Sequence, residues 1–220
     1  MKKQLYNIIA KGGIKFLSKT FPEYFQTEPL APSDRYIEYH FAISNLPKTP
    51  AKILDVGCSG TFFPLLLAGF GYDTVGVDIR PYPILNKLSF NNFTFYQTDI
   101  DNILIKDFDC ITLISTLEHI GIGGRYGMKE RENGDRVVMD KVATLLKPDG
   151  YVLLTIPYGK FQVNRPYNKV YDHYNLKLTL NSHFETVEEQ YYINNGNWER
   201  CGFWELMDKE GLACLKLRLK

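Results

Sequence analysis

The chain has 220 residues, a formal net charge of +1 and a hydrophobic fraction of 45%, values that fit one α/β domain with a small appendage. A net charge this close to zero excludes a protein-wide attraction to nucleic acid, and no apolar run approaches the ~18 residues of a membrane-spanning helix. The four cysteines are widely spaced, and no Cys/His group has zinc-site spacing. We therefore expect a cytoplasmic protein with reduced cysteines, no bound metal and no nucleic-acid partner.

Residues 1–32 are predicted to form a basic extension and linker ahead of a single domain at 33–220. Residues 1–22 carry five Lys and no acidic residue, and their apolar residues recur at roughly helical spacing. Gly12-Gly13 should interrupt a helix in the middle. A helix packed on the domain, an interfacial or partner-binding segment, and disorder all remain open.

Strands and helices alternate through the rest of the chain, which indicates βαβ units and a mostly parallel sheet. Ligands of such sheets bind beyond the carboxyl ends of the strands, so the loops after the first five strands are expected to form the site. A turn is expected at 147–150. The helices are predicted over 35–46, 62–70 and 135–146, and the strands over 52–56, 74–77, 93–97, 109–115, 151–156, 184–193 and 212–219.

The first predicted strand runs into a turn of small residues, Gly57-Cys58-Ser59-Gly60-Thr61. Asp78 ends the second strand, 21 positions beyond Gly57. A carboxylate there can accept both ribose hydroxyl protons of an adenosine, and small residues let the backbone approach the ligand. Dinucleotide sites and S-adenosylmethionine sites share both features, so they indicate an adenosine cofactor and do not yet distinguish the two.

The residue that follows the turn separates these two kinds of site. A GxGxxG site needs a final Gly so that the helix N-terminus can face a pyrophosphate, and this chain has Phe62 there. S-adenosylmethionine carries no phosphate, and Asp55 suits a ligand with a cationic amine and sulfonium, unless it is a cap or turn residue. Asp99 can accept a hydrogen bond from the adenine amine or cap a helix. The pattern favours the methyl donor; an NAD-dependent oxidoreductase is the rival enzyme.

The stretch Lys52 to Pro157 resembles the class I S-adenosylmethionine-dependent methyltransferases. This resemblance implies a Rossmann-like α/β fold with a mostly parallel seven-stranded sheet, helices on both faces and an N-terminal helical extension. A narrower resemblance, in GYDTVGVDIRPYP, STLEHIGIGGRYG, TIPYG and VYD, points to a bacterial methyltransferase-like subgroup linked to surface-polysaccharide or secondary biosynthesis. The wider family's motifs appear, in order, as ILDVGCSG, VGVDIR, QTDI, FDCITLISTLEHIG and LLKPDGYVLLTIPYG.

The resemblance also assigns residues to cofactor binding. Ser59 departs from the family, which usually has Gly at that position, and Thr61 departs where Gly is frequent, although Thr61 can cap the following helix. The cofactor residues so implied are Asp55, Gly57, Cys58, Ser59, Gly60, Asp78, Ile79, Asp99, Ile100, Ser115 and Thr116.

Methyl transfer from a sulfonium is an in-line displacement, so the protein supplies positioning and, where the acceptor needs it, a base. The loop at 115–119 is expected to face the methyl group. His119 is the candidate catalytic base because the ordinary pKa of histidine lies near neutral pH, and Glu118 would orient it. A purely structural role for His119 in the turn is the alternative.

The Gly-rich, charged stretch at 120–136 is interpreted as a substrate loop, with Arg125 and Tyr126 as contacts to an anionic or sugar-like substrate; a solvated loop is the alternative. Tyr158 belongs to a second candidate cluster after the fifth strand, together with Tyr171, Asp172 and His173. Asp172 equally suits the N-cap of a helix.

The sequence therefore predicts an S-adenosylmethionine-dependent methyltransferase acting on a small molecule. A cofactor-binding but non-catalytic subunit or regulator is the alternative from another class. Methylation of nucleic-acid bases is not favoured, because residues 115–118 read STLE in place of an Asn/Asp-Pro-Pro-Tyr tetrad and the domain has no basic patch with interleaved aromatics.

Overall fold

The structure, a computed structural model, describes residues 34–124, 126, 129–180 and 183–220. The expected N-terminal extension therefore lies outside the described residues. The α-helices are α2 (Arg35–Ser44), α3 (Phe63–Gly69), α4 (Gly134–Leu145) and α5 (His173–Leu180), with short 3-10 helices η2 (Pro83–Asn86), η3 (Ile100–Asn102), η4 (Leu117–His119) and η6 (Phe203–Leu206). The strands are β1 (Lys52–Val56), β2 (Asp73–Asp78), β3 (Phe93–Gln97), β4 (Phe108–Ile114), β5 (Leu146–Gly159), β6 (Gln162–Asn164), β7 (Asn168–Val170), β8 (Phe184–Asn194), β9 (Trp198–Cys201) and β10 (Glu210–Leu219).

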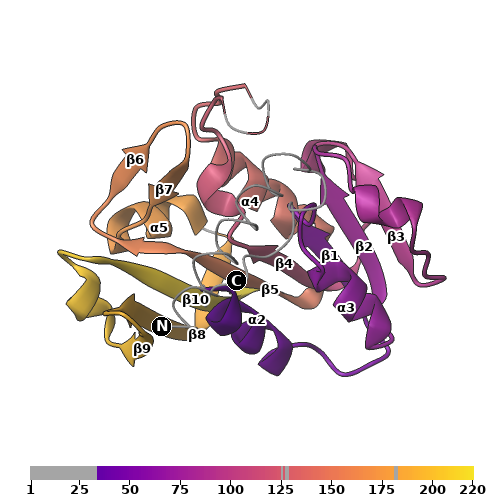
Figure 1. The fold of residues 1–220 in the computed structure, drawn as a ribbon, viewed down its shortest axis with the longest axis horizontal. Helices are drawn as coiled ribbons and strands as arrows, with labels where there is room; N and C mark the ends of the chain where they lie inside the picture. The colour runs from indigo at the N-terminus through magenta and orange to yellow at the C-terminus, as the bar shows by residue number, and fades with distance from the viewer. Residues whose placement is uncertain (1–33, 125, 127–128, 181–182) are drawn as a thin grey trace, which may run out of the picture.

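One sheet of eight strands crosses the molecule in the order β3-β2-β1-β4-β5-β10-β8-β9, and β6 pairs with β7 in a separate hairpin (Figure 1). The prediction of seven strands was wrong, because the short edge strand β9 adds an eighth. Its sequence, WERC, has no run of alternating apolar residues. It pairs antiparallel with β8 across a turn that contains Gly196.

The two halves of the sheet differ in direction. Strands β3, β2, β1, β4 and β5 are parallel to one another, whereas β10, β8 and β9 each run antiparallel to their neighbours. The chain leaves β1 toward β2 and β3 and then returns to β4 on the opposite side of β1. This reversal places a topological switch point between β1 and β4, where open α/β sheets bind ligands.

The period of two along each strand divides the core between the two faces of the sheet. Leu54 and Leu154 belong to the cluster that also contains residues of α4 and α5. Ile53 and Leu153, one position earlier, belong to the cluster with residues of α2 and α3. Both faces are therefore covered by helices, as the resemblance implied.

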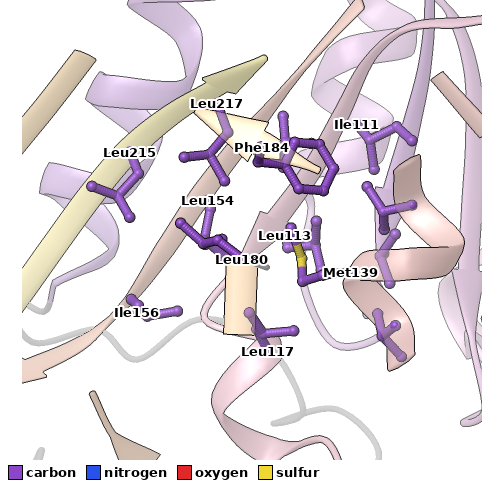
Figure 2. Packing of buried hydrophobic residues seen from close by; sticks show 14 of the residues in the cluster. Ile111, Leu113, Leu117, Met139, Leu154, Ile156, Leu180, Phe184, Leu215 and Leu217 are labelled. Atoms are coloured by element: carbon purple, nitrogen blue, oxygen red, sulfur yellow. The ribbon is translucent and has the colours of Figure 1, made fainter. Parts of the chain in front are cut away.

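The larger cluster packs α4 and α5 against one face of the sheet. Figure 2 shows side chains of β4, β5 and β10 meeting side chains of α4 and α5. Leu117, which begins η4, is fully buried in this cluster. The loop that carries the candidate catalytic residues is thereby anchored in the core.

The turn expected at 147–150 lies inside β5. Phe108 pairs with Leu146, and Cys110 pairs with Tyr151. Residues 147–150 therefore form a bulge in a continuous strand. Gly150 suits the bulge because a Cβ there would lie 2.7 Å from the Phe108 carbonyl oxygen. The prediction of a turn was wrong because a bulge uses the same residue types.

The start of α5 agrees with the N-cap interpretation of Asp172. The backbone N–H of Asn175 donates to Asp172 Oδ1 at 2.7 Å, which is the contact of a capping side chain.

Among the described residues, no helix combines the length and apolar character that crossing a bilayer requires.

Candidate active site

A cavity of about 290 Å³ opens at the carboxyl ends of β1, β2, β3 and β4. The ends of these four strands and the turns after them supply most of its wall, and α2, the loop before α4 and α4 itself supply the rest. The residues on the wall are Arg35, Val56, Gly57, Ser59, Gly60, Thr61, Val77, Asp78, Ile79, Arg80, Thr98, Asp99, Ile100, Ile114, Ser115, Thr116, His119, Ile120, Tyr126 and Val138.

The turn after β1 depends on glycine at two positions. Gly57 and Gly60 have φ angles of +76° and +87°, in the region that only glycine adopts without strain. A Cβ at Gly57 would also lie 2.5 Å from the Thr116 side chain. The turn after β1 is therefore packed tightly against the turn after β4.

Ser59, the departure from the family pattern, is accommodated without strain. It is not among the described residues with a left-handed backbone, so the position does not require glycine. Its hydroxyl donates to the Pro81 carbonyl, and its backbone N–H donates to Asp78 Oδ2 at 2.9 Å. Ser59 thus ties the first turn to the end of β2.

Asp78 is the central carboxylate of the wall, and its side chain is only 3% exposed. Besides the Ser59 N–H, it accepts the Arg80 backbone N–H at 2.8 Å on Oδ1. The Arg80 guanidinium binds it in a fork, from Nε to Oδ1 at 3.1 Å and from Nη2 to Oδ2 at 2.8 Å. The sequence pattern did not single out Arg80.

Asp99 combines both of its predicted roles. Its side chain lines the cavity, and its Oδ1 accepts the backbone N–H of Asp101 at 3.0 Å where η3 begins. Ile79 and Ile100 also lie on the wall. A carboxylate and two branched apolar side chains on one wall suit the polar edge and the apolar faces of an adenine ring.

Asp55 and Cys58 are not on the wall. Asp55 is buried below the turn and accepts the Thr112 hydroxyl at 2.6 Å, and burial raises the pKa of its carboxyl to about 7. Cys58 is buried against β2, where a Cβ on Gly76 would lie 2.8 Å from its sulfur. Direct contact of either side chain with a cofactor stays a prediction.

The other side of the wall is held by a buried carboxylate that sequence reasoning missed. Glu38 in α2 has no exposed surface and accepts the hydroxyls of Ser115 at 2.5 Å and Thr155 at 2.6 Å. Arg35 donates to its other oxygen at 2.7 Å, and burial raises the pKa of Glu38. These bonds anchor α2 to the ends of β4 and β5 and present Arg35 to the cavity. Only the spacing of Arg35 and Glu38 on one helical face hinted at the pair.

His119 lies on the wall, with Glu118 beside it and off the wall. The Nδ1 atom of His119 is 2.6 Å from the Tyr167 carbonyl oxygen. Because a carbonyl only accepts, Nδ1 carries the proton, and Nε2 is the basic nitrogen of the neutral ring. Nε2 lies 3.5 Å from Glu118 Oε1.

Glu118 is 3% exposed, and its Oε2 atom has no hydrogen-bond partner. Burial raises the pKa of this carboxyl to about 8. Glu118 therefore keeps its proton at neutral pH, beside Nε2 of His119.

The candidate substrate residues separate in the structure. Tyr126 is on the wall. Its ring centroid lies 4.3 Å from Arg80 Cζ and 5.9 Å from the ring centroid of His119. Tyr158 is buried against Tyr191, with ring centroids 4.9 Å apart, and is not on the wall. Arg125 lies outside the described residues.

The second candidate cluster is not brought to the cavity. Tyr171 is buried and donates to Asp135 at 2.8 Å. His173 lies beside Phe203, with ring centroids 6.4 Å apart.

The wall suits a nucleoside without a pyrophosphate. The first turn of α3 does not present a free backbone donor at Phe63, whose N–H donates to Thr61 Oγ1 at 3.4 Å, and Phe62 is 44% exposed there. The N-cap of α3 is Phe62, without a side-chain cap hydrogen bond, so Thr61 contacts the helix from one position earlier and does not cap it as expected. Beneath the glycine turn, Asp78 supplies acceptors for a ribose, and Arg35 supplies a cation for a carboxylate. This donor set fits S-adenosylmethionine.

Comparisons with known proteins agree with this geometry. Structures of similar fold include the PH0226 protein of Pyrococcus horikoshii OT3, with a TM-score of 0.62, 16% identity and coverage of 92% of this chain and 98% of that one. A TehB-like SAM-dependent methyltransferase of Corynebacterium glutamicum has a TM-score of 0.55, 16% identity and coverage of 99% and 100%. A Burkholderia thailandensis 1,6-didemethyltoxoflavin-N1-methyltransferase, solved with 1,6-didemethyltoxoflavin and S-adenosylhomocysteine, has a TM-score of 0.59, 15% identity and coverage of 99% and 90%.

At these identities the structural likeness shows the fold alone, and no curated protein matches the chain. The decisive comparison is with families, because residues 31–190 match a family described as a methyltransferase domain. The chain therefore belongs to this methyltransferase family and is an S-adenosylmethionine-dependent enzyme.

Proposed function

We propose that this enzyme methylates a small, anionic or sugar-like molecule, with the cofactor held between the turns after β1 and β4. The observation that carries the proposal is the pairing of a left-handed glycine turn at Gly57 with the buried carboxylate of Asp78. The turn lets a ligand approach the backbone, and the carboxylate supplies two oxygens for a ribose diol. When bound, S-adenosylmethionine supplies a methyl group on a sulfonium, which is the electrophile of the reaction.

The wall residues divide into those for adenosine and those for the amino-acid end. Asp78 holds the ribose, while Asp99, Ile79 and Ile100 hold the adenine. Gly57 and its neighbours Ser59 and Gly60 face the amino-acid end, where Thr116 and Arg35 also lie. The Arg35 guanidinium binds the carboxylate, because a forked donor matches a carboxylate in geometry and charge. Asp55 and Cys58 support the turn from below.

The acceptor side is proposed to lie at His119 and Tyr126. An acceptor that must lose a proton gives it to Nε2 of His119, and Glu118 lies beside that nitrogen, 3.5 Å away, and orients the ring. Tyr126 offers a hydroxyl and a ring face, which suit a sugar-like molecule. The narrower sequence resemblance, to proteins of surface-polysaccharide or secondary biosynthesis, supports an acceptor of this kind. Most of the acceleration is expected to come from positioning.

The test incubates the enzyme with S-adenosylmethionine and a panel of acceptors, and mass spectrometry measures the S-adenosylhomocysteine that forms. The panel holds nucleotide sugars, free sugar acids, phenols and aromatic carboxylates. We expect product with a sugar-like or anionic acceptor and none with Asp78→Ala. Binding of S-adenosylhomocysteine without turnover of any acceptor would instead favour a non-catalytic, cofactor-binding subunit. Product formed only with neutral aromatic amines would overturn the acceptor class.

A further inference from the structure

The carboxylate of Asp78 is saturated by groups of the protein. A carboxylate offers about four lone-pair sites, and Asp78 accepts four hydrogen bonds: the backbone N–H groups of Ser59 and Arg80, and two N–H groups of the Arg80 guanidinium. A ribose that uses Asp78 must therefore displace part of this set.

The two kinds of bond differ in how easily they are given up. The backbone donors belong to the turn after β1 and to the chain that follows β2, so losing them would require the backbone to move. The guanidinium is at the end of a flexible side chain that is 31% exposed. It makes two bonds to Asp78, and a ribose diol brings two O–H donors. If the ribose diol replaces the guanidinium, the carboxylate accepts four hydrogen bonds both with and without the ligand.

Two further contacts hold Arg80 over the ribose position. Its Nη2 also donates to the Ser59 carbonyl at 2.6 Å, and the Tyr126 ring covers the guanidinium at 4.3 Å. Such cation–π contacts contribute modestly at partly exposed sites. Arg80 thus bridges the turn after β1 and the loop before α4, and both elements line the cavity.

We propose that Arg80 is an internal competitor for the ribose of the cofactor, with Tyr126 as the residue that holds it in place. This inference rests on the proposed cofactor site. Adenosine binding exchanges the Arg80 fork for the ribose diol, and no covalent bond is made or broken. The apparent affinity of a ligand falls with the fraction of protein competent to bind it, so an arginine that closes the site in about nine of ten molecules weakens binding about tenfold.

Isothermal titration calorimetry with S-adenosylhomocysteine tests the proposal. This product of the methyl donor has no sulfonium charge and no net charge, so deletion of a cation does not change its long-range attraction. We expect Arg80→Ala to bind it about tenfold more tightly than the unmodified enzyme, and Arg80→Lys to fall between them, because an ammonium makes no fork. Arg218→Ala is the matched control. It removes another arginine from an ion pair, with Glu185, away from the cavity wall, and should bind as the unmodified enzyme does.

Two additional measurements separate competition from a general effect on folding. For an analogue that lacks both ribose hydroxyls, Arg80→Ala should raise the affinity by less than about twofold, because that ligand does not need Asp78. Tyr126→Ala should tighten binding about two- to threefold, whereas Tyr126→Phe keeps the ring over Arg80 and should have no effect. Arg80→Gln serves if Arg80→Ala does not fold.

Unchanged or weaker binding by folded Arg80→Ala, with binding by the unmodified enzyme intact, overturns the competitor and leaves the cofactor site standing. Binding by Arg80→Ala alone, with none by the unmodified enzyme, supports the competitor strongly. Absence of binding by both, in folded protein, contradicts the proposed cofactor site and the competitor together. An equal gain for the analogue without ribose hydroxyls also contradicts competition for Asp78.

Discussion

The donor side and the acceptor side of the cavity are built differently. On the donor side the buried carboxylates are satisfied: Asp78 accepts four hydrogen bonds, and Glu38 accepts hydroxyls and a guanidinium. On the acceptor side Glu118 has a buried oxygen without a hydrogen bond. Tyr167, whose carbonyl holds His119, is 63% exposed. In the proposed function, a hydrogen-bonded polar network on the donor side positions the cofactor, whereas a loop and an acid with an unpaired oxygen meet the acceptor.

The largest expected effect comes from breaking the donor side at Gly57. In Gly57→Ala the Cβ meets the Thr116 side chain at 2.5 Å in a backbone with φ of +76°. We expect a loss of about 2–4 kcal/mol of stability and a loss of S-adenosylhomocysteine binding of at least about 100-fold, measured by chemical denaturation and calorimetry. Gly196→Ala is the control, because Gly196 has φ of +101° but no atom near its Cβ position. Equal effects of the two changes would show that backbone strain alone, and not the packed turn, matters.

The next effect breaks the acceptor side. His119→Ala is expected to lower kcat about 100-fold, the usual contribution of a general base, for an acceptor that must be deprotonated. Binding of S-adenosylhomocysteine should change by less than about threefold, because the donor contacts stay in place. Measurement of kcat and of the dissociation constant separates an effect on catalysis from an effect on cofactor binding. An equal loss of both would make His119 a structural residue of the turn.

A third prediction uses the buried acid of the acceptor side. Burial raises the pKa of Glu118 from 4.5 to about 8, so the folded protein holds this proton more tightly than the unfolded chain does. Its contribution to stability is complete below about pH 4.5, falls as the pH rises, and is lost once the pH passes about 8. Glu118→Gln should therefore show a smaller decline of Tm between about pH 5 and about pH 9. On the alkaline side, its Tm should lie a few degrees above that of the unmodified protein.

Part of the decline should persist in Glu118→Gln, because burial also raises the pKa of Asp55 to about 7. Glu132→Gln is the control, since Glu132 is exposed. A Tm profile of Glu118→Gln parallel to that of the unmodified protein would show that Glu118 is charged throughout this range.

The same contrast explains what the sequence could predict. The donor side rests on local patterns: an apolar strand, a glycine turn and an acid at the end of the next strand. These predicted β1, the turn at Gly57 and the position of Asp78. Glu38 and its partners Ser115 and Thr155 are 77 and 117 positions apart, and no local pattern links them.

Arg80 was missed for a different reason. Two positions after Asp78 it reads as an ordinary surface residue, and only the structure shows its fork on the carboxylate. The hairpin of β6 and β7 and the strand β9 were missed because they are short and lack regular alternation.

The smallest expected effect concerns Ser59. Ser59→Gly loses the hydroxyl bond to Pro81 but keeps the backbone bond to Asp78. We expect a loss of about 1 kcal/mol of stability and a change of less than about threefold in S-adenosylhomocysteine binding. Denaturation and calorimetry measure both. A gain of tenfold or more in affinity would mean that the hydroxyl obstructs the cofactor.

The most direct test of the donor site is calorimetry of S-adenosylhomocysteine with Asp78→Ala. Asp73→Ala is the matched control, because Asp73 begins the same strand at its exposed end. We predict binding weakened at least about tenfold by Asp78→Ala, as expected for loss of two charge-assisted hydrogen bonds, and unchanged by Asp73→Ala. Equal affinity of Asp78→Ala and the unmodified enzyme would contradict the assignment of the ribose to Asp78.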